Sequence, residues 1–197
     1  MKIGVLALQG AFIEHIKILQ EIGVEAIEIR KSEQLKSVQG LIIPGGESTT
    51  FGKLATDFGM LDDLRVFCKD NAVFGTCAGA IFLSKDIQED QPLLNLMDIK
   101  VFRNAFGRQV DSFEIDLNIP ALEKVDPKNR LFHAIFIRAP IIEAAYGDAE
   151  ILATLPDGRI VAVQEGRWLA TSFHPELTGD DRIHRYFISM IQESTKS

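Results

Sequence analysis

The sequence predicts an α/β protein, with a mostly parallel, twisted sheet flanked by helices on both faces and some antiparallel strands in the second half. In the first half, short apolar segments alternate with segments of helical periodicity, which is the pattern of a parallel sheet covered by helices. In the second half, short strand-like segments follow one another with turn signals between them. We expect a single domain over residues 1–197, because no repeat, low-complexity tract or linker divides the chain.

The first half opens with an expected strand over residues 2–8. It is followed by an amphipathic helix with apolar side chains at positions 12, 13, 16, 19 and 22. Gly23 is expected to end that helix. Further strands are expected over residues 24–29, 41–43 and 72–74, and the last of these leads into a helical segment at residues 80–83. These elements make up the predicted parallel part of the sheet.

The second half contains five strand candidates, at residues 111–117, 134–137, 150–155, 160–163 and 168–173. Pro156-Asp157-Gly158 marks a turn between two of them. We expect these strands to extend the main sheet and to supply its antiparallel part. Apolar residues at positions 183, 186, 187, 190 and 191 predict a closing helix.

The composition argues against several classes of protein. A net charge of −7 disfavours a nucleic-acid surface, which needs clustered lysines and arginines. Two cysteines in unlike settings favour a reducing compartment over a disulfide scaffold. No apolar run approaches the length of about 18 residues that a membrane span needs, and the apolar start is too short for a signal sequence. We therefore expect a cytoplasmic protein with neither membrane nor nucleic-acid partners.

The most informative motif is Gly75-Thr76-Cys77-Ala78-Gly79, which lies between a strand-like and a helix-like run. A nucleophile flanked by glycines at such a junction is typical of a nucleophile elbow, a sharp turn in a strained conformation. A thiol is mostly protonated at neutral pH and needs a base. His174-Pro175-Glu176 supplies a candidate base, His174, and a carboxylate, Glu176, that orients it.

Each half of this pattern also has a purely structural interpretation. A cysteine among apolar residues is most often a packing residue, and we interpret Cys68, in a helix-like run, in that way. Cys77 differs because of its flanking glycines. His174-Pro175-Glu176 taken alone fits a helix start, with proline in the first turn. The two motifs together favour catalysis.

Two further loops are candidates for binding a ligand. Residues 44–50 read P-G-G-E-S-T-T after a strand, and in an open α/β sheet ligands bind at the carboxyl ends of the strands. The alternative is a tight turn with Ser48 or Thr49 as the helix N-cap. Arg103 and Arg138 suit a substrate carboxylate because the guanidinium is planar and bidentate, or else they form ion pairs within the fold. The histidines and cysteines show no metal-ligand spacing.

These residues resemble the class I glutamine amidotransferases, and more closely the glutaminase subunits of pyridoxal 5'-phosphate synthase. The resemblance runs from residue 2 to about residue 191. It rests on A-L-Q-G-A with Glu14-His15, P-G-G-E-S-T-T, G-T-C-A-G, R-N-A-F-G-R-Q at 103–109, F-I-R-A-P at 136–140, and H-P-E-L-T. Gly179 departs from the family pattern by one inserted residue.

The resemblance implies that L-glutamine is hydrolysed to glutamate and ammonia through a cysteine thioester, without metal or cofactor. It implies that a separate synthase partner with a (β/α)8 barrel uses the ammonia to build pyridoxal 5'-phosphate, and that the glutaminase is slow without it. The implied catalytic residues are Cys77, His174 and Glu176. The implied glutamine-binding residues are Gly46, Glu47, Ser48, Arg103, Ile137 and Arg138. The oxyanion hole would use the amides of Ala78 and Gly46, and the partner would contact Gln9, Glu14, His15 and Lys17.

Two other functions compete with this one. A cysteine peptidase or amidase on a related scaffold would also use a cysteine elbow, but it gives no reason for the two arginine motifs or the P-G-G-E-S-T loop. A catalytically inactive regulatory protein is disfavoured because Cys77, His174 and Glu176 are all present. A glutaminase assay with and without the synthase separates the three.

Overall fold

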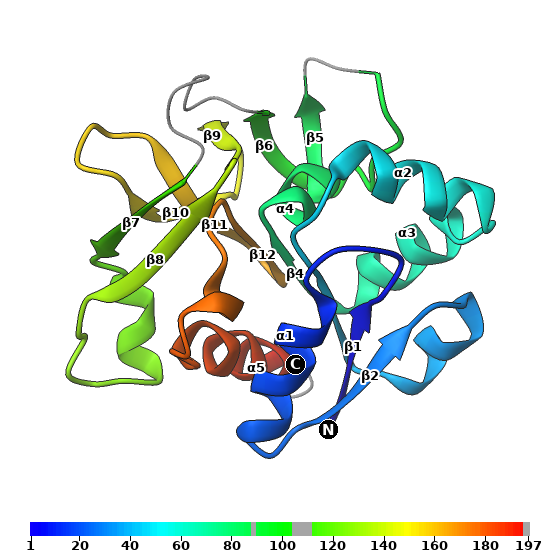
Figure 1. Ribbon diagram of the computed structural model, residues 1–197, viewed down its shortest axis with the longest axis horizontal. Helices are drawn as coiled ribbons and strands as arrows, with labels where there is room; N and C mark the ends of the chain where they lie inside the picture. The colour runs from blue at the N-terminus through cyan, green and yellow to red at the C-terminus, as the bar shows by residue number, and fades with distance from the viewer. Residues whose placement is uncertain (88–89, 104–111, 195–197) are drawn as a thin grey trace.

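The computed structural model describes residues 1–87, 90–103 and 112–194. Its centre is a sheet whose order begins β2-β1-β3-β4-β12, and all neighbours in this part are parallel (Figure 1). These five strands are β1 (Lys2–Leu6), β2 (Glu25–Ile29), β3 (Gly40–Ile43), β4 (Ala72–Thr76) and β12 (Trp168–Thr171). The parallel sheet expected from the first half of the sequence is confirmed.

The sheet continues beyond β12 with mostly antiparallel strands, in the order β11-β9-β6-β5. β11 is antiparallel to β12, to β9 and to β10, while β5 and β6 are parallel to each other. The bounds are β5 (Ser84–Ile87), β6 (Met97–Phe102), β9 (Ile141–Ala145), β10 (Glu150–Thr154) and β11 (Ile160–Glu165). Of these five strands, β5, β6 and β9 were not expected from the sequence.

One expectation about the sheet is wrong. β7 (Ser112–Leu117) and β8 (Phe132–Ile137) do not extend the main sheet but form a separate antiparallel pair. Buried and more exposed positions alternate along β8, so only one face of this ribbon is covered. Phe136 on that face stacks on Phe113 and packs edge-on against Phe173 of the main body. The pair therefore lies across the sheet as a covering layer.

Helices cover both faces of the sheet, as predicted. α1 (Phe12–Glu21) and α5 (Arg182–Ser194) pack on one face, and α2 (Ser48–Asp57), α3 (Leu61–Asp70) and α4 (Ala78–Leu83) pack on the other (Figure 1). Successive strand residues point to opposite faces, so Val73 belongs to one core and Phe74 to the other. Short 3-10 helices occupy η1 (Ser32–Ser37), η2 (Pro120–Lys124) and η3 (Pro175–Leu177).

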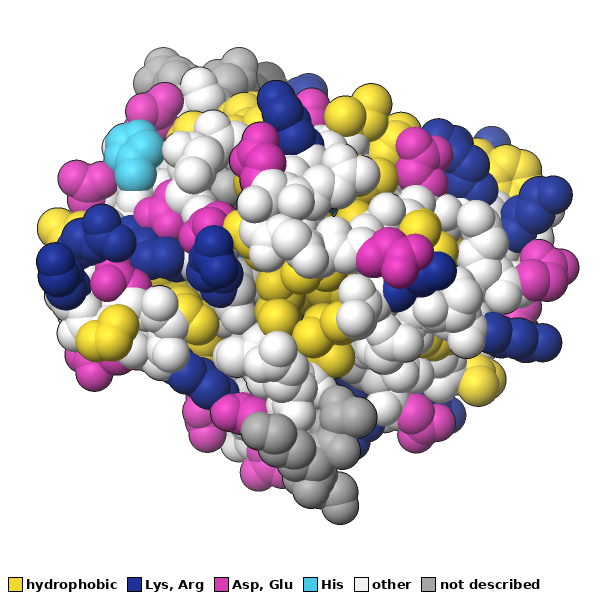
Figure 2. Space-filling model, turned by 90° about the horizontal axis from the view of Figure 1, so that it is seen from below, with side chains coloured by type: hydrophobic (Ala, Val, Ile, Leu, Met, Phe, Trp, Pro, Cys, Tyr) yellow, Lys and Arg dark blue, Asp and Glu magenta, His cyan; other side chains and the backbone are white. Residues whose placement is uncertain are grey.

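The surface carries mixed charges. On the face shown in Figure 2, basic and acidic side chains are interspersed among the described residues. Among the helices of the described ranges, none is long and apolar enough to cross a membrane.

The topology brings four loops to one edge of the sheet. The segments that follow β1, β3, β4 and β12 all leave from carboxyl ends of neighbouring parallel strands, where open α/β sheets bind ligands. These segments contain Gln9, Gly45, Cys77 and His174, and all four residues line one cavity.

Candidate active site

Cys77 occupies a nucleophile elbow. It lies between β4 and α4 with φ 49° and ψ −107°, a conformation that non-glycine residues rarely adopt. Its amide donates to the carbonyl of Thr171 on β12 at 2.8 Å, which holds the turn against the sheet. A Cβ on Gly75 would lie 2.6 Å from Gly79, and a Cβ on Gly79 would lie 2.1 Å from the Ile43 carbonyl oxygen. The flanking glycines are therefore required sterically, as the sequence predicted.

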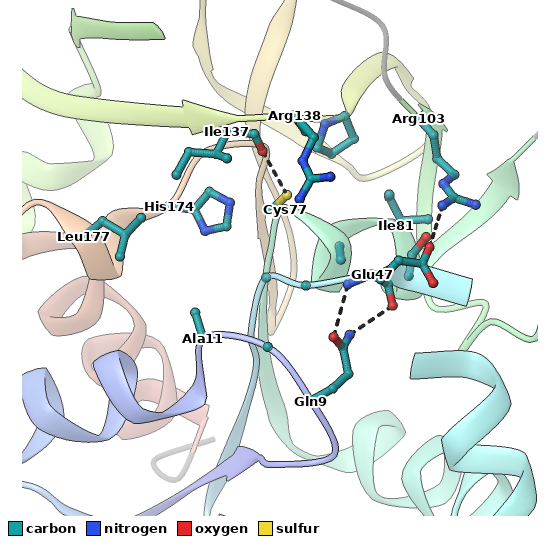
Figure 3. A pocket seen from close by; sticks show the side chains of 16 residues that line it. Gln9, Ala11, Glu47, Cys77, Ile81, Arg103, Ile137, Arg138, His174 and Leu177 are labelled. Carbon is teal, nitrogen blue, oxygen red and sulfur yellow. Dashed lines mark hydrogen bonds and ion pairs between the residues drawn. The ribbon is translucent and has the colours of Figure 1, made fainter. Parts of the chain in front are cut away.

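His174 and Glu176 come from the segment after β12. His174 precedes the short helix η3, and its amide donates to the carbonyl of Ile135 on β8 at 2.8 Å. The Nδ1 atom of His174 lies 2.7 Å from Oε1 of Glu176, and both residues are buried. Pro175 begins η3, so the helix-start interpretation is also correct. Figure 3 shows the His174 ring beside Cys77, within the cavity.

The electrostatics around His174 and Glu176 favour the charged forms of both side chains. Burial opposes protonation of His174, but hydrogen bonds with Cys77 and Glu176 outweigh it and raise the pKa of His174 to about 10. Burial of Glu176 is likewise outweighed, by His15 and His174, and its pKa is lowered. A cationic ring at this position is the kind of neighbour that activates a cysteine nucleophile. Cys68 lies fully buried in α3, where burial raises the pKa of its thiol, so it is a packing residue.

The P-G-G-E loop is held in place by the loop after β1. The Ala11 amide donates to the Gly45 carbonyl at 3.0 Å, and the Gln9 side chain exchanges two hydrogen bonds with the backbone of Glu47. Gly10 has φ +86°, and a Cβ there would lie 1.9 Å from the Gly45 carbonyl oxygen. Because the C=O and N–H of a trans peptide point in opposite directions, the Ala11 contact also sets the direction of the Gly46 amide.

The helix cap in this loop differs from the alternative interpretation of the sequence, which named Ser48 or Thr49. The N-cap of α2 is Glu47, whose carboxylate accepts from the amides of Thr49 and Thr50. Ser48 is instead the first helical residue and is buried. Burial would raise the pKa of Glu47, but the hydrogen bonds from Thr49 and Thr50 lower it to about 2. An ionised N-cap also suits the helix dipole.

The cavity measures about 550 Å³, within the usual range for a small-molecule site. All residues expected to bind glutamine line it: Gly46, Glu47, Ser48, Arg103, Ile137 and Arg138. Arg103 forms an ion pair with Glu47 at 2.6 Å and also lines the cavity. The two interpretations of this arginine, an ion pair within the fold and a place at the binding site, are therefore compatible. Arg138 comes directly after β8 and has φ 42°. Figure 3 shows its side chain in the cavity. The other residues of the R-N-A-F-G-R-Q motif, 104–109, lie outside the described residues.

The four residues expected to contact the partner differ in location and exposure. Gln9 lies in the cavity wall, and Glu14 and Lys17 are exposed on α1. The expectation for His15 is wrong: it was expected to contact the partner, but it is fully buried and points toward Glu176. Its spacing from Phe12 and Leu19, three and four residues away, could have revealed that it shares their inward side.

The comparisons with known proteins agree with this geometry. The model of the SNO glutamine amidotransferase family matches residues 5–193. The chain belongs to this family. It is 56% identical over 193 residues to the pyridoxal 5'-phosphate synthase subunit PdxT of Moorella thermoacetica, covering 97% of this chain and 100% of that one. It is 55% identical over 195 residues to PdxT of Dehalococcoides mccartyi, covering 96% and 97%.

Solved structures of the family and of more distant proteins share the fold. A crystal structure described as a glutamine amidotransferase has a TM-score of 0.89 and 48% identity, covering 96% of this chain and 98% of that one. The structure of PurLQS from Thermotoga maritima has a TM-score of 0.68 at 15% identity, covering 98% of this chain and 96% of that one, which shows the fold alone.

The described residues contain no group of three or more histidine, cysteine, aspartate or glutamate side chains that could hold a metal ion.

Proposed function

We propose that this chain hydrolyses L-glutamine to glutamate and ammonia, and that it is the glutaminase subunit of a pyridoxal 5'-phosphate synthase. The observation that carries the proposal is the elbow cysteine beside a buried histidine–glutamate pair, in a cavity edged by Arg103 and Arg138. Family membership and the PdxT relatives support the same activity.

In the proposed reaction, the Cys77 thiolate attacks the side-chain amide carbon of glutamine. The tetrahedral oxyanion is met by the amides of Ala78 and Gly46, and one such donor contributes about 3 kcal/mol. The His174 imidazolium gives its proton to the departing nitrogen, so ammonia leaves and a γ-glutamyl thioester remains. His174 then takes a proton from water, which attacks the thioester and releases glutamate and the thiol. Glu176 keeps the His174 ring oriented throughout.

Substrate recognition is proposed to use charge. The α-carboxylate of glutamine suits the guanidinium groups of Arg103 and Arg138, and the Glu47 loop lies on the same wall of the cavity. Ile137 and Ser48 complete the wall, and the Ile137 carbonyl oxygen is 4.0 Å from the Cys77 sulfur. The charge of Glu47 persists at all ordinary pH values because its pKa is about 2.

We also propose that the ammonia passes to the synthase inside a complex, because ammonia released into water is protonated and loses its nucleophilicity. The synthase partner is proposed to be a (β/α)8 barrel that contacts Gln9, Glu14 and Lys17. Gln9 is hydrogen-bonded to the loop that contains Gly46, so contact there would orient a proposed oxyanion donor.

A steady-state glutaminase assay tests the proposal. The isolated chain is expected to be slow, and saturating synthase is expected to raise kcat about 10²-fold, more than it lowers KM, since it completes an oxyanion donor. Charge reversal at Lys17 is expected to weaken this activation without unfolding the chain. No hydrolysis of glutamine with synthase present would contradict the proposal, and cleavage of peptide amides instead would favour a peptidase.

A further inference from the structure

Two buried histidines, His15 and His184, lie behind Glu176 on the side away from the cavity. Glu176 presents one carboxylate oxygen to His174, and its other oxygen, Oε2, lies 3.4 Å from Nε2 of His15. His15 is on α1, which packs against η3, and it is fully buried. Oε2 is buried and has no hydrogen bond of standard geometry among the described residues, so Nε2 of His15 is a nearby polar group able to supply one.

His15 in turn touches two buried polar groups. Its Nδ1 lies 2.9 Å from Nε2 of His184 on α5, and its Nε2 lies 3.3 Å from the hydroxyl of Thr76, next to Cys77 in the chain. His184 is also fully buried, and its remaining nitrogen has no partner among the described residues. The series therefore connects α5, α1 and η3 without reaching solvent.

The protons in this series can be assigned. Burial lowers the pKa of both His15 and His184, and the neighbouring Glu176 carboxylate opposes this shift at His15. An ionised Glu176 can only accept, so the tautomer of His15 that suits this site carries its N–H on Nε2, between the carboxylate and the Thr76 hydroxyl. The opposite tautomer would direct a nitrogen lone pair at a negative oxygen. Nδ1 of His15 then accepts from Nε2–H of His184, and the unpartnered atom of His184 is a bare acceptor.

We propose that His15 is a positioning residue of the active site, whose Nε2–H fixes the second oxygen of Glu176 so that the first stays aimed at His174. This rests on the proposed glutaminase function. A carboxylate held at one oxygen can turn about its terminal torsion, whereas one held at both cannot. Residues that orient metal ligands from behind change activity by about 10- to 100-fold when they are replaced, and we expect an effect of similar size for a residue that orients a carboxylate. His15 thereby leaves the set of partner contacts and joins the machinery that orients the base.

The test uses the complex with synthase and compares His15→Leu with His15→Gln. Leucine fills the site without a donor, whereas glutamine places an amide N–H near the position of Nε2. We expect His15→Leu to lower kcat about 10-fold or more with KM changed less than about 2-fold. His15→Gln should recover kcat to within about 3-fold of the native value.

Phe187→Leu is the matched control. Phe187 is fully buried in the same core and contacts Phe74, and no described contact joins it to His15 or Glu176. It should lower Tm while leaving kcat near the native value. If kcat falls in parallel with Tm across all three variants, or if His15→Gln is as impaired as His15→Leu, the positioning role is wrong.

A second measurement separates this inference from the proposed function. The rate of Cys77 alkylation by iodoacetamide at about pH 6.5 needs no glutamine and reports the thiolate that the His174 imidazolium stabilises. His15→Leu should slow it several-fold, and His15→Gln should restore it. Native alkylation rates in His15→Leu would overturn the inference. Fast alkylation of the native chain together with no glutamine hydrolysis would overturn only the proposed function.

Discussion

The molecule contains two histidines that contact carboxylates at almost the same distance, in very different places. Nδ1 of His174 lies 2.7 Å from Glu176 in the buried wall of the cavity. Nδ1 of His133 lies 2.8 Å from Asp116 on the outer face of the β7–β8 pair. The pKa is raised in both histidines, so distance and charge alone do not distinguish them.

The difference lies in the second ring nitrogen and in exposure. Nε2 of His133 is taken by a second carboxylate, Glu114, at 3.0 Å, and its side chain is 50% exposed. His174 is buried, and its ring lies beside Cys77 in the cavity (Figure 3). A histidine–carboxylate pair suits the proposed catalysis where the ring lies beside a nucleophile and water is largely excluded. Substitutions in and around the two pairs test that comparison.

The largest effect is expected from removing the nucleophile. Cys77→Ala should reduce glutamine hydrolysis by about 10⁴-fold or more, because no thioester can form. Circular dichroism and Tm should show a folded protein. Cys68→Ala is the control: it removes a buried sulfur with no access to the cavity, so turnover should stay near native. An inactive Cys68→Ala beside an active Cys77→Ala would overturn the elbow assignment.

The second largest effect on activity is expected from replacing His174, with the replacement of His133 as the comparison. His174→Ala should lose nearly all activity, whereas His133→Ala should lose none, although both remove a histidine bonded to a carboxylate. Glu176→Gln should keep more activity than His174→Ala, with a loss of about 10²- to 10⁴-fold, since misorientation is less damaging than loss of the base. Steady-state kinetics of the complex measure all three. Comparable activity in His174→Ala and His133→Ala would erase the distinction between the two sites.

A smaller effect is expected at the binding side of the cavity. Arg103→Ala and Arg138→Ala should each raise KM for glutamine about 10- to 100-fold with little change in kcat, because a charge-assisted hydrogen bond to the substrate is lost. Arg185→Ala on α5, which breaks a surface ion pair with Asp181, is the matched control and should change neither constant. Unchanged KM in both cavity variants would leave these arginines with structural roles only.

The smallest effect concerns pH and His133. Hydrogen bonds that the His133 ring donates to Asp116 and Glu114 raise its pKa in the folded state, so the stability that they give the fold is complete below the unfolded value of about 6.5. It is lost as pH rises through the folded value. The Tm difference between the native protein and His133→Gln should therefore be largest near pH 6 and vanish at alkaline pH. A difference that grows with pH would mean that the histidine is held neutral.

Much of the fold could be predicted because the signals are local. The strands and helices of the parallel half follow from apolar periodicity, and the elbow follows from two glycines around a cysteine. The separate β7–β8 pair could not be predicted, because the alternation in β8 is the same for a ribbon as for a strand at the edge of the main sheet. β5, β6 and β9 are short strands whose place in the sheet depends on pairing with one another and with β11.

The candidate site shows the same contrast between residues that local sequence patterns predict and contacts that they do not. Residue types and order in the sequence determined Cys77, His174 and Glu176 as candidates, because an elbow and a histidine–carboxylate pair each need only near neighbours in the chain. Only the tertiary structure decided which groups meet across the sheet: the Gln9 clamp on Glu47, the Arg103–Glu47 pair, and buried His15 behind Glu176. These contacts join residues 38 or more positions apart, and their geometry is set by how the strands pack, which no local pattern encodes.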